Sequence, residues 1–190
     1  CRVPDWFLKL VADKWTEERG RRGTPMLLTT ERLRIVPLTP RQLGLWLHDI
    51  PALEKELDCR CTAGSPRGDF RRIVACSVQH ALAAADPGNH LFHTFWFLIL
   101  RDGGAVAGSA CFKGAADADG RVEIGYGLES LEKQGYMTET VRALCAWAKQ
   151  QPGVRHITAE TEPDNRASHR VLQRAGFHPA EADAARWRSL

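Results

Sequence analysis

The chain has 190 residues, of which 44% are hydrophobic and 26% are charged, and its formal net charge is +3. This length and composition predict one globular domain that buries its own core, and they exclude a disordered or fibrous chain. Arg19, Arg21 and Arg22 form a basic cluster, but nucleic-acid-binding surfaces usually carry a longer basic stripe with aromatic residues between, so a solvated linker explains it better.

The first predicted element is a helix over residues 5–20, because Leu8 and Trp15 fall on one helical face. The stretch "GRRGTP" that follows is typical of a linker. We therefore expect a helical extension and linker over residues 1–29, followed by a single domain over residues 30–190.

A strand and two helical segments come next. The stretch "ERLRIVPL" alternates Leu33 and Ile35 with charged neighbours, which predicts a strand, and Pro37 favours an edge position for it. In "TPRQLGLWLHDIPALEKEL", Thr39 is a suitable N-cap and Pro40 suits the first helical position. A second helix is predicted over "DFRRIVACSVQHALAAA".

The pattern then changes to strands joined by hairpins. The stretches "HTFWFLILRD", "AVAGSACFKG" and "RVEIGYGLE" predict three strands separated by glycine-containing turns. The unbroken apolar block Phe95–Leu100 indicates that the first of them is buried on both faces. A helix is expected to begin near Gly135, because Val141, Leu144 and Ala148 then share one face.

The last part of the chain alternates strands and a helix. The stretch "VRHITAETE" predicts a strand with Ile157 and Ala159 on one side, and "NRASHRVLQRAG" predicts a helix that ends at Gly176. The stretches "FHPA" and "ARWRS" are expected to be short final strands. An antiparallel meander followed by a β-α-β-α-β order indicates an α/β (α+β) fold, with a mixed sheet and helices on both faces.

No segment predicts a membrane span or a metal site. The longest apolar run is far too short to cross a bilayer, and Lys9 interrupts "WFLKLVA", so we expect a cytoplasmic protein. Cys59 and Cys61 form a C-x-C without a second pair of ligands, which is a poor zinc signature, and no metal is expected. Cys111 and Cys145 sit among apolar residues and should be small buried hydrophobes.

The short run "EKQGYMTETV" places one glycine directly ahead of a predicted helix. Unpaired amides at a helix start and the positive end of its dipole favour a phosphate, and a glycine lets the ligand approach the backbone. The candidate donors are the amides of Gln134, Gly135, Tyr136, Met137 and Thr138. An ordinary helix-entry loop explains the same residues, and the absence of a following GK[ST] excludes a P-loop.

Two longer stretches carry a family resemblance. "EIGYGLESLEKQGYMTETVRALCAWA", followed by "ETEPDNRASHRVLQRAGF", resembles the GNAT superfamily of acetyl-CoA-dependent N-acetyltransferases, in the branch of the RimJ/RimL type. The resemblance covers roughly residues 30–190. It implies a mostly antiparallel central sheet in which two splayed parallel strands, here "EIGYGL" and "HITAETE", hold the pantetheine arm of acetyl-CoA.

The family's pyrophosphate loop, [QR]-x-x-G-x-[GA], is only partly matched. Its signature positions hold Glu132, Gly135 and Met137, so two of the three depart from the pattern. Glu132 brings a negative charge toward the pyrophosphate, and Met137 is larger than the usual glycine or alanine. Both departures are expected to weaken cofactor binding and leave the fold unchanged.

The resemblance also assigns cofactor contacts outside this loop. The backbone amides of Tyr126, Gly127 and Leu128 are expected to pair with the pantetheine arm and to polarise the thioester carbonyl. Asn165 has two interpretations, as a helix cap and as a hydrogen-bond partner of the pantetheine. Arg170 could reach a cofactor phosphate, although a solvated helix charge is the simpler interpretation.

Acetyl transfer to an amine needs a base for the amine proton and an acid for the departing thiolate. Ser168, at the serine of the N-x-x-S motif, is the preferred acid, although a first-turn serine is also an ordinary capping residue. Glu123, in "EIGY", is the first choice of base, and Glu160 and Glu162 are alternatives on a neighbouring strand. A carboxylate facing an apolar cleft would have a raised pKa, whereas a strand glutamate in a salt bridge would be structural.

The resulting hypothesis is an N-acetyltransferase that transfers acetyl directly from acetyl-CoA to a primary amine, on a protein N-terminus or a small molecule. A non-catalytic acyl-CoA-binding or regulatory domain with a degenerate loop is the alternative. We expect a monomer or homodimer that binds neither nucleic acid nor membrane. In this family the helices at 40–85 form one wall of the acceptor cleft, and an excess of acidic side chains there would indicate a cationic acceptor.

Overall fold

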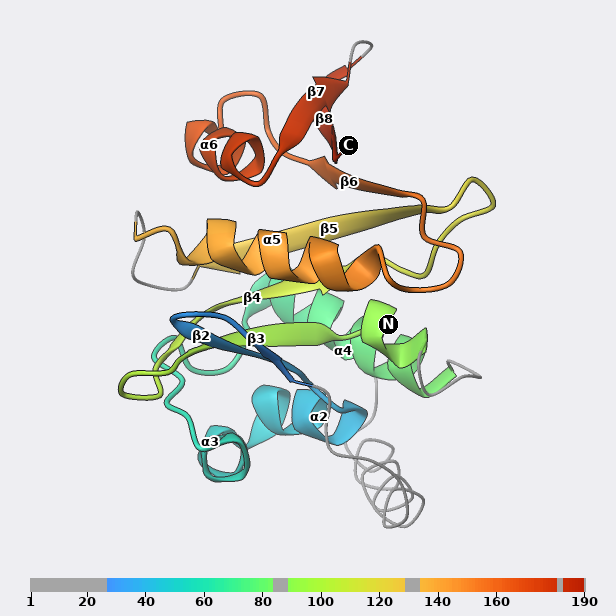
Figure 1. Cartoon of the computed structure of the whole chain (residues 1–190). Coiled ribbons are helices and arrows are strands. Elements are labelled where there is room, and N and C mark those ends of the chain that lie inside the picture. The colour runs from blue at the N-terminus through green and yellow to red at the C-terminus, as the bar shows by residue number, and fades with distance from the viewer. Residues whose placement is uncertain (1–26, 84–88, 129–133, 181–182, 190) are drawn as a thin grey trace.

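The computed structural model describes residues 27–83, 89–128, 134–180 and 183–189 (Figure 1). The helix predicted over residues 5–20 lies outside these ranges. The strands are β1 (Leu28–Thr29), β2 (Leu33–Pro37), β3 (Phe95–Leu100), β4 (Val106–Phe112), β5 (Arg121–Leu128), β6 (His156–Glu160), β7 (Phe177–Ala180) and β8 (Asp183–Ser189). The helices are α2 (Pro40–His48), α3 (Ile50–Leu57), α4 (Gly68–Ala83), α5 (Tyr136–Ala148) and α6 (Arg166–Arg174), with a short 3-10 helix η1 (Asn89–Phe92).

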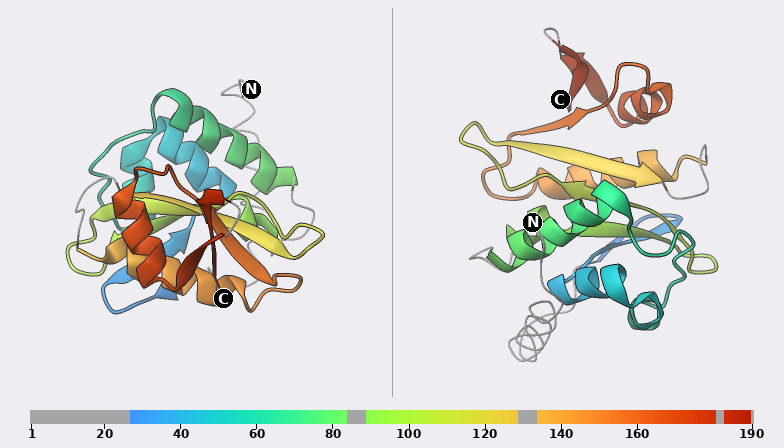
Figure 2. Two further views of the ribbon diagram at one scale, coloured as in Figure 1. Left: turned by 90° about the horizontal axis from the view of Figure 1, so that it is seen from above. Right: turned by 180° about the vertical axis from the view of Figure 1, so that it is seen from behind.

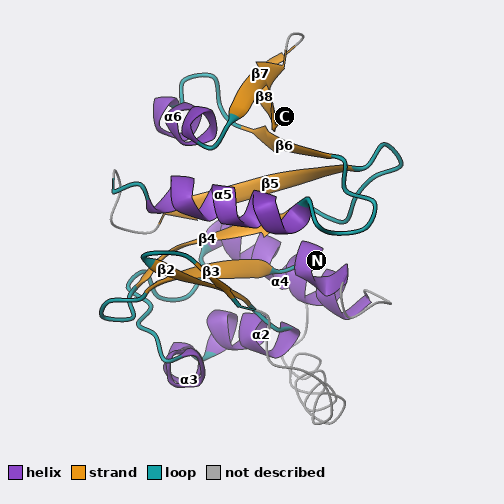
Figure 3. Ribbon diagram, in the orientation of Figure 1, coloured by secondary structure: helices purple, strands orange, loops and turns teal. Residues whose placement is uncertain are grey.

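The strands form one sheet in the order β1-β2-β3-β4-β5-β6-β8-β7. Every neighbouring pair is antiparallel except β5 and β6, which run parallel. Helices α2, α3 and α4 cover one face of the sheet, and α5 covers the other (Figures 2 and 3). The predicted mixed sheet with helices on both faces and one parallel strand pair is confirmed.

Strand β3 lies in the middle of two apolar cores. Phe95, Phe97 and Ile99 pack with α2, α3 and α4, whereas Trp96 and Leu98 pack in the core that includes α5. The predicted burial of this strand on both faces is therefore confirmed. Because side chains alternate along a strand, the same rule assigns the residues of β4 and β5 to one face or the other.

The edge position predicted for β2 is wrong in part. Strand β1 pairs with β2, Leu28 opposite Ile35 and Thr29 opposite Arg34. A strand of two residues is too short to show a periodic pattern, so β1 could not be predicted. Pro37 lies beyond these two pairs, where the outer side of β2 requires no amide from it.

The helical segment after β2 begins as predicted and then breaks. Thr39 and Gln42 form a capping box at the start of α2, with Pro40 in the first helical turn. The single helix expected across this segment is split in two, and the Asp49 side chain caps α3. The physical reason is Pro51, whose ring lacks an amide proton and would clash with the carbonyl of residue 47 in a continuous helix.

The parallel ladder between β5 and β6 is short. Its register joins Arg121, Val122 and Glu123 to His156, Ile157 and Thr158, respectively, and no pair is found beyond Glu123 in the described part of the chain. Strand β5 nevertheless continues to Leu128, and α5 starts on the same side of the molecule as α6 (Figure 1). The two strands therefore splay apart at the end where both of these helices begin.

Candidate active site

Helix α5 begins directly after Gly135, at the helix start for which phosphate binding is predicted. Gly135 is its N-cap, in the left-handed region with φ +83°, and no side chain of the described residues caps this helix. A β-carbon at Gly135 would lie 3.4 Å from Arg32 Nη2, in a backbone conformation that side chains rarely adopt. The first-turn amides of α5 are thus left without a side-chain acceptor, as a phosphate site requires.

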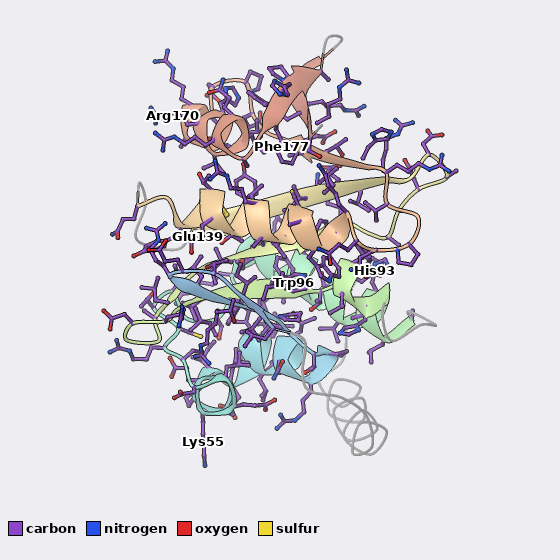
Figure 4. The ribbon with its side chains drawn as sticks, in the orientation of Figure 1. Lys55, His93, Trp96, Glu139, Arg170 and Phe177 are labelled. Atoms are coloured by element: carbon purple, nitrogen blue, oxygen red, sulfur yellow. The ribbon has the colours of Figure 1, made fainter. Side chains whose placement is uncertain are left out.

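Arg32 is a residue of this region that the sequence did not reveal. Its Nη1 donates to the carbonyl of Gln134 at 2.8 Å, its Nε donates to Glu139 Oε2 at 2.8 Å, and its guanidinium lies 4.6 Å from the ring centroid of Tyr136. Glu139 lies in the first turn of α5, beside the start of β2 (Figure 4). Arg32 therefore holds Gln134, just before the helix, against the first turn of α5.

The Arg32 contacts also act on Glu139. Partial burial raises the pKa of the Glu139 carboxyl, but hydrogen bonds from Thr30 and from Arg32, together with the charge of Arg32, outweigh burial and lower it. Glu139 is therefore ionised at neutral pH. It balances the guanidinium charge next to the helix start.

The two departures from the loop signature have different outcomes. Met137 is 2% exposed and belongs to the core on the α5 face, so its side chain points into the protein. The Met137 side chain therefore does not crowd the space in front of the helix start, contrary to expectation. Glu132 lies outside the described residues.

Tyr126 and Ser168 meet where β5 and β6 diverge. The phenol oxygen of Tyr126, on β5, lies 2.9 Å from Ser168 Oγ in the first turn of α6. Asn165 is the N-cap of α6, and its Oδ1 accepts the amide proton of Ser168 at 3.0 Å. Asn165 therefore fills the capping role considered for both residues, and the Ser168 hydroxyl is left for Tyr126. Sequence reasoning had used only the backbone of Tyr126.

Glu123 lies in a charged group on the opposite face of the sheet. Lys113 contacts the carboxylate of Glu123 and lies 3.8 Å from Glu160 Oε2, and Arg186 Nε donates to Glu160 at 3.0 Å. Burial lowers the pKa of Lys113, but its hydrogen bond to Glu123 and the nearby carboxylates outweigh this effect and raise it. Glu160 is exposed, whereas Glu123 is partly buried. Both glutamates thus lie in salt bridges, the arrangement expected of structural strand glutamates, and the role of base remains a proposal for Glu123.

The candidate acid and base thus lie on opposite faces. Tyr126 packs with the α5 core, as does its strand neighbour Ile124. Glu123 is three positions from Tyr126, so its side chain points toward the face of α4. Ser168 joins the α5 face through Tyr126. The structure therefore brings Tyr126 and Ser168 together on one face and groups Glu123 with Lys113 and Glu160 on the other.

A cleft of about 530 Å³ opens on the α4 face, between α4 and strands β3 and β4. Asp69, Arg72, His80, His93 and Lys113 are among its polar lining residues. Burial, followed by the charge of His80, lowers the pKa of His93, whose ring centroid is 6.1 Å from that of His80. The apolar and thiol side chains of the lining are Ile73, Cys76, Phe95, Cys111 and Phe112.

The remaining predicted contacts are less defined. Gly127 and Leu128 continue β5 opposite Ser109 and Gly108 of β4. Arg170 is exposed on α6 (Figure 4), which leaves both interpretations of this residue open. Thr138 is nearly buried in the first turn of α5.

Two further kinds of feature are absent from the described residues. They contain no group of three or more histidine, cysteine, aspartate or glutamate side chains that could hold a metal ion. No helix in the described ranges has both the length and the apolar character that a membrane span needs.

Comparisons with known proteins identify the family of this chain. Residues 32–178 match the family model described as an acetyltransferase (GNAT) domain. The chain is 29% identical over 163 residues to a Bacillus subtilis (strain 168) protein named "Uncharacterized N-acetyltransferase YjdG", with 80% of this chain and 89% of that protein covered.

Solved structures share the fold. A ribosomal-protein-S5-alanine acetyltransferase from Vibrio fischeri is similar with a TM-score of 0.58 and 14% identity, covering 81% of this chain and 84% of that one. A complex of RimL, a ribosomal L7/L12 α-N-protein acetyltransferase, with coenzyme A is similar with a TM-score of 0.56 and 18% identity, covering 86% and 95%. With the matched family model and the site geometry, these findings confirm the resemblance: the chain belongs to the GNAT family of acetyltransferases.

Proposed function

We propose that the protein is an N-acetyltransferase that transfers acetyl from acetyl-CoA directly to a primary amine. The observation that carries this proposal is the splay beyond Glu123, with the uncapped start of α5 on one face and the α4 cleft on the other. The first face offers amides to a pyrophosphate and the second offers an approach for an amine. A thioester in the splay would be reached from both sides.

This geometry divides the chemistry between two residues. The amine nitrogen attacks the thioester carbon, so that a carbon–nitrogen bond forms, the carbon–sulfur bond breaks and the electron pair leaves with sulfur. Glu123 takes the proton that nitrogen loses, and Ser168 gives the proton that sulfur gains. Exchange of both groups with solvent restores their starting protonation states.

The cleft also favours one class of acceptor. Asp69 is its acidic lining residue and is paired with Arg72 at 3.0 Å, while Lys113 adds a second cation. The excess of acidic side chains that a polyamine would need is not found among the described lining residues. The apolar wall suits an amine on an apolar body, such as a peptide N-terminus.

The described cysteines are free thiols, as expected of a protein in the reducing cytoplasm.

The test combines cofactor binding with turnover. Calorimetric titration with coenzyme A and acetyl-CoA should give micromolar affinity, and acetyl-CoA should be consumed faster with peptides of apolar N-terminal sequence than with spermidine. Gly135→Asp should weaken coenzyme A binding about tenfold or more, because it adds bulk and a negative charge beside the phosphates.

Gly153→Asp is the matched control. Gly153 also has a positive φ, +82°, but it lies in the turn after α5, and a β-carbon there meets no atom within 4 Å. Its variant should bind coenzyme A like the unsubstituted protein. Equal affinity of the Gly135→Asp variant would show that the α5 start is not the phosphate site. Tight binding without turnover of any amine would favour a non-catalytic acyl-CoA-binding domain.

A further inference from the structure

The hydrogen bond between Tyr126 and Ser168 spans the divergence of β5 and β6. Tyr126 lies three residues beyond Glu123, where the parallel ladder ends, and Ser168 lies on the helix that follows β6. Their oxygens are 2.9 Å apart, and the Tyr126 hydroxyl also lies 3.5 Å from the Ser168 carbonyl oxygen. The phenol of Tyr126 therefore links strand β5 to Ser168, the proposed acid, on the helix that follows β6.

Either oxygen could donate in this bond, and the acidity of the phenol favours Tyr126 as the donor. Burial raises the pKa of Tyr126 and outweighs the opposite effect of the Ser168 hydrogen bond, so the phenol keeps its proton. A phenol O–H is a stronger donor than an aliphatic hydroxyl, because its pKa is several units lower. We therefore take Tyr126 as the donor and Ser168 Oγ as the acceptor.

The serine proton is then directed elsewhere. A hydroxyl carries one hydrogen and two acceptor lone pairs. Because Ser168 Oγ accepts from Tyr126, its own hydrogen must turn away from the phenol. The serine is not needed as a helix cap, since Asn165 Oδ1 already accepts the Ser168 amide proton. A hydrogen turned away from the phenol can point into the space between the strands, where the proposed function places the thioester.

We propose that Tyr126 is a positioning residue for acetyl transfer, whose phenol holds the Ser168 hydroxyl so that its proton points to the departing sulfur. This inference rests on the proposed function. The same hydrogen bond stabilises the negative charge that develops on Ser168 Oγ as its proton leaves for the thiolate. Tyr126 exchanges no proton itself and needs no further reactant.

The experiment is a double-mutant cycle with Tyr126→Phe and Ser168→Ala, read out by kcat, KM and the calorimetric Kd of coenzyme A. Tyr126→Phe keeps the ring and its packing. It should lower kcat about tenfold, the size of one hydrogen bond, and leave the Kd of coenzyme A within about twofold. The double variant should be no slower than Ser168→Ala alone, because Tyr126 acts through Ser168.

Thr39→Ala is the control for lost stability. It removes a hydroxyl whose oxygen accepts a hydrogen bond in the capping box of α2, remote from the splay, and it should lower the urea midpoint without changing kcat. Independent, multiplicative losses in the double variant would overturn the positioning role, as would an unchanged kcat in Tyr126→Phe. In both cases turnover by the unsubstituted protein would leave the proposed function standing. Failure of the unsubstituted protein to acetylate any amine would overturn both proposals.

Discussion

Lys113, directly after β4, and Glu123 of β5 form an ion pair on the face of the sheet that α4 covers. The same ammonium lies 3.8 Å from Glu160, so one cation serves two carboxylates. The Lys113 ammonium therefore holds the Glu123 carboxylate in place at the end of the parallel ladder between β5 and β6.

The first prediction distinguishes the two candidate bases. Glu123→Gln should lower kcat by about a hundredfold or more, the usual contribution of a positioned general base. Glu160→Gln should have a much smaller effect, because Glu160 is exposed and held by Arg186. Steady-state kinetics with one peptide acceptor measures both. A larger loss in Glu160→Gln would assign the base to β6 in place of β5.

The second prediction concerns the cation beside the candidate base. Lys113→Met should lower kcat about tenfold, because it removes the ammonium that contacts the Glu123 carboxylate and holds it in place. The raised pKa of Lys113 keeps this ammonium charged throughout the assay range. Lys113→Arg keeps the charge and should retain most of the activity. An unchanged kcat in Lys113→Met would show that Lys113 does not position the base.

The third prediction concerns stability at acid pH. The pKa of Glu139 is lowered in the folded protein, so its contribution is present above the unfolded-state pKa and is lost as pH falls through the folded-state value. Glu139→Gln should lower the free energy of unfolding by about 1 kcal/mol at pH 7. At pH 3 the difference should shrink. Urea unfolding at both pH values measures it.

Glu31→Gln is the matched control for this ion pair. Glu31 neighbours Arg32 and is exposed. Its variant should unfold like the unsubstituted protein at both pH values. A difference for Glu139→Gln that stays constant between pH 7 and pH 3 would contradict the assigned ion pair.

The fourth prediction concerns thiol reactivity. Burial raises the pKa of Cys111 to about 11 and that of Cys145 to about 12. The thiolate is the reactive form, so both should resist iodoacetamide at pH 8 in the native protein and react in urea. Peptide mapping by mass spectrometry identifies the labelled sites. Rapid native labelling of Cys145 would contradict its buried position in α5.

Local patterns predicted most of the fold. The apolar block of β3, the helix cap at Thr39 and the start of α5 after Gly135 each depend on residues adjacent in sequence, and each is confirmed. The two-residue strand β1 was missed because it is too short to have a period. The break between α2 and α3 was missed although Pro51 signalled it.

The contacts within the candidate site could not be predicted from local sequence patterns. The motifs named Glu123 and Ser168, but the side-chain partners of each come from distant segments. Arg32 and Glu139 are 107 positions apart, and nothing in either local pattern indicates their contact. The alternation of side chains along a strand does predict one feature of the site. Glu123 and Tyr126 are an odd number of positions apart, so their side chains face opposite sides of the sheet.

The short ladder between β5 and β6 is the boundary between a smaller C-terminal part of the sheet and the larger remainder. Strands β6, β8 and β7 and helix α6 join the rest of the sheet through three residue pairs in the described part of the chain. The Tyr126–Ser168 bond, the Arg142 bond to the Arg174 carbonyl and apolar side chains such as Leu172 and Phe177, which share a core with α5, add to this connection. Opening this seam costs less than unfolding β3 and β4, which are paired on both sides. We therefore expect the C-terminal part to exchange its amide protons as a separate cooperative unit, and a ligand clasped in the seam to slow that exchange selectively.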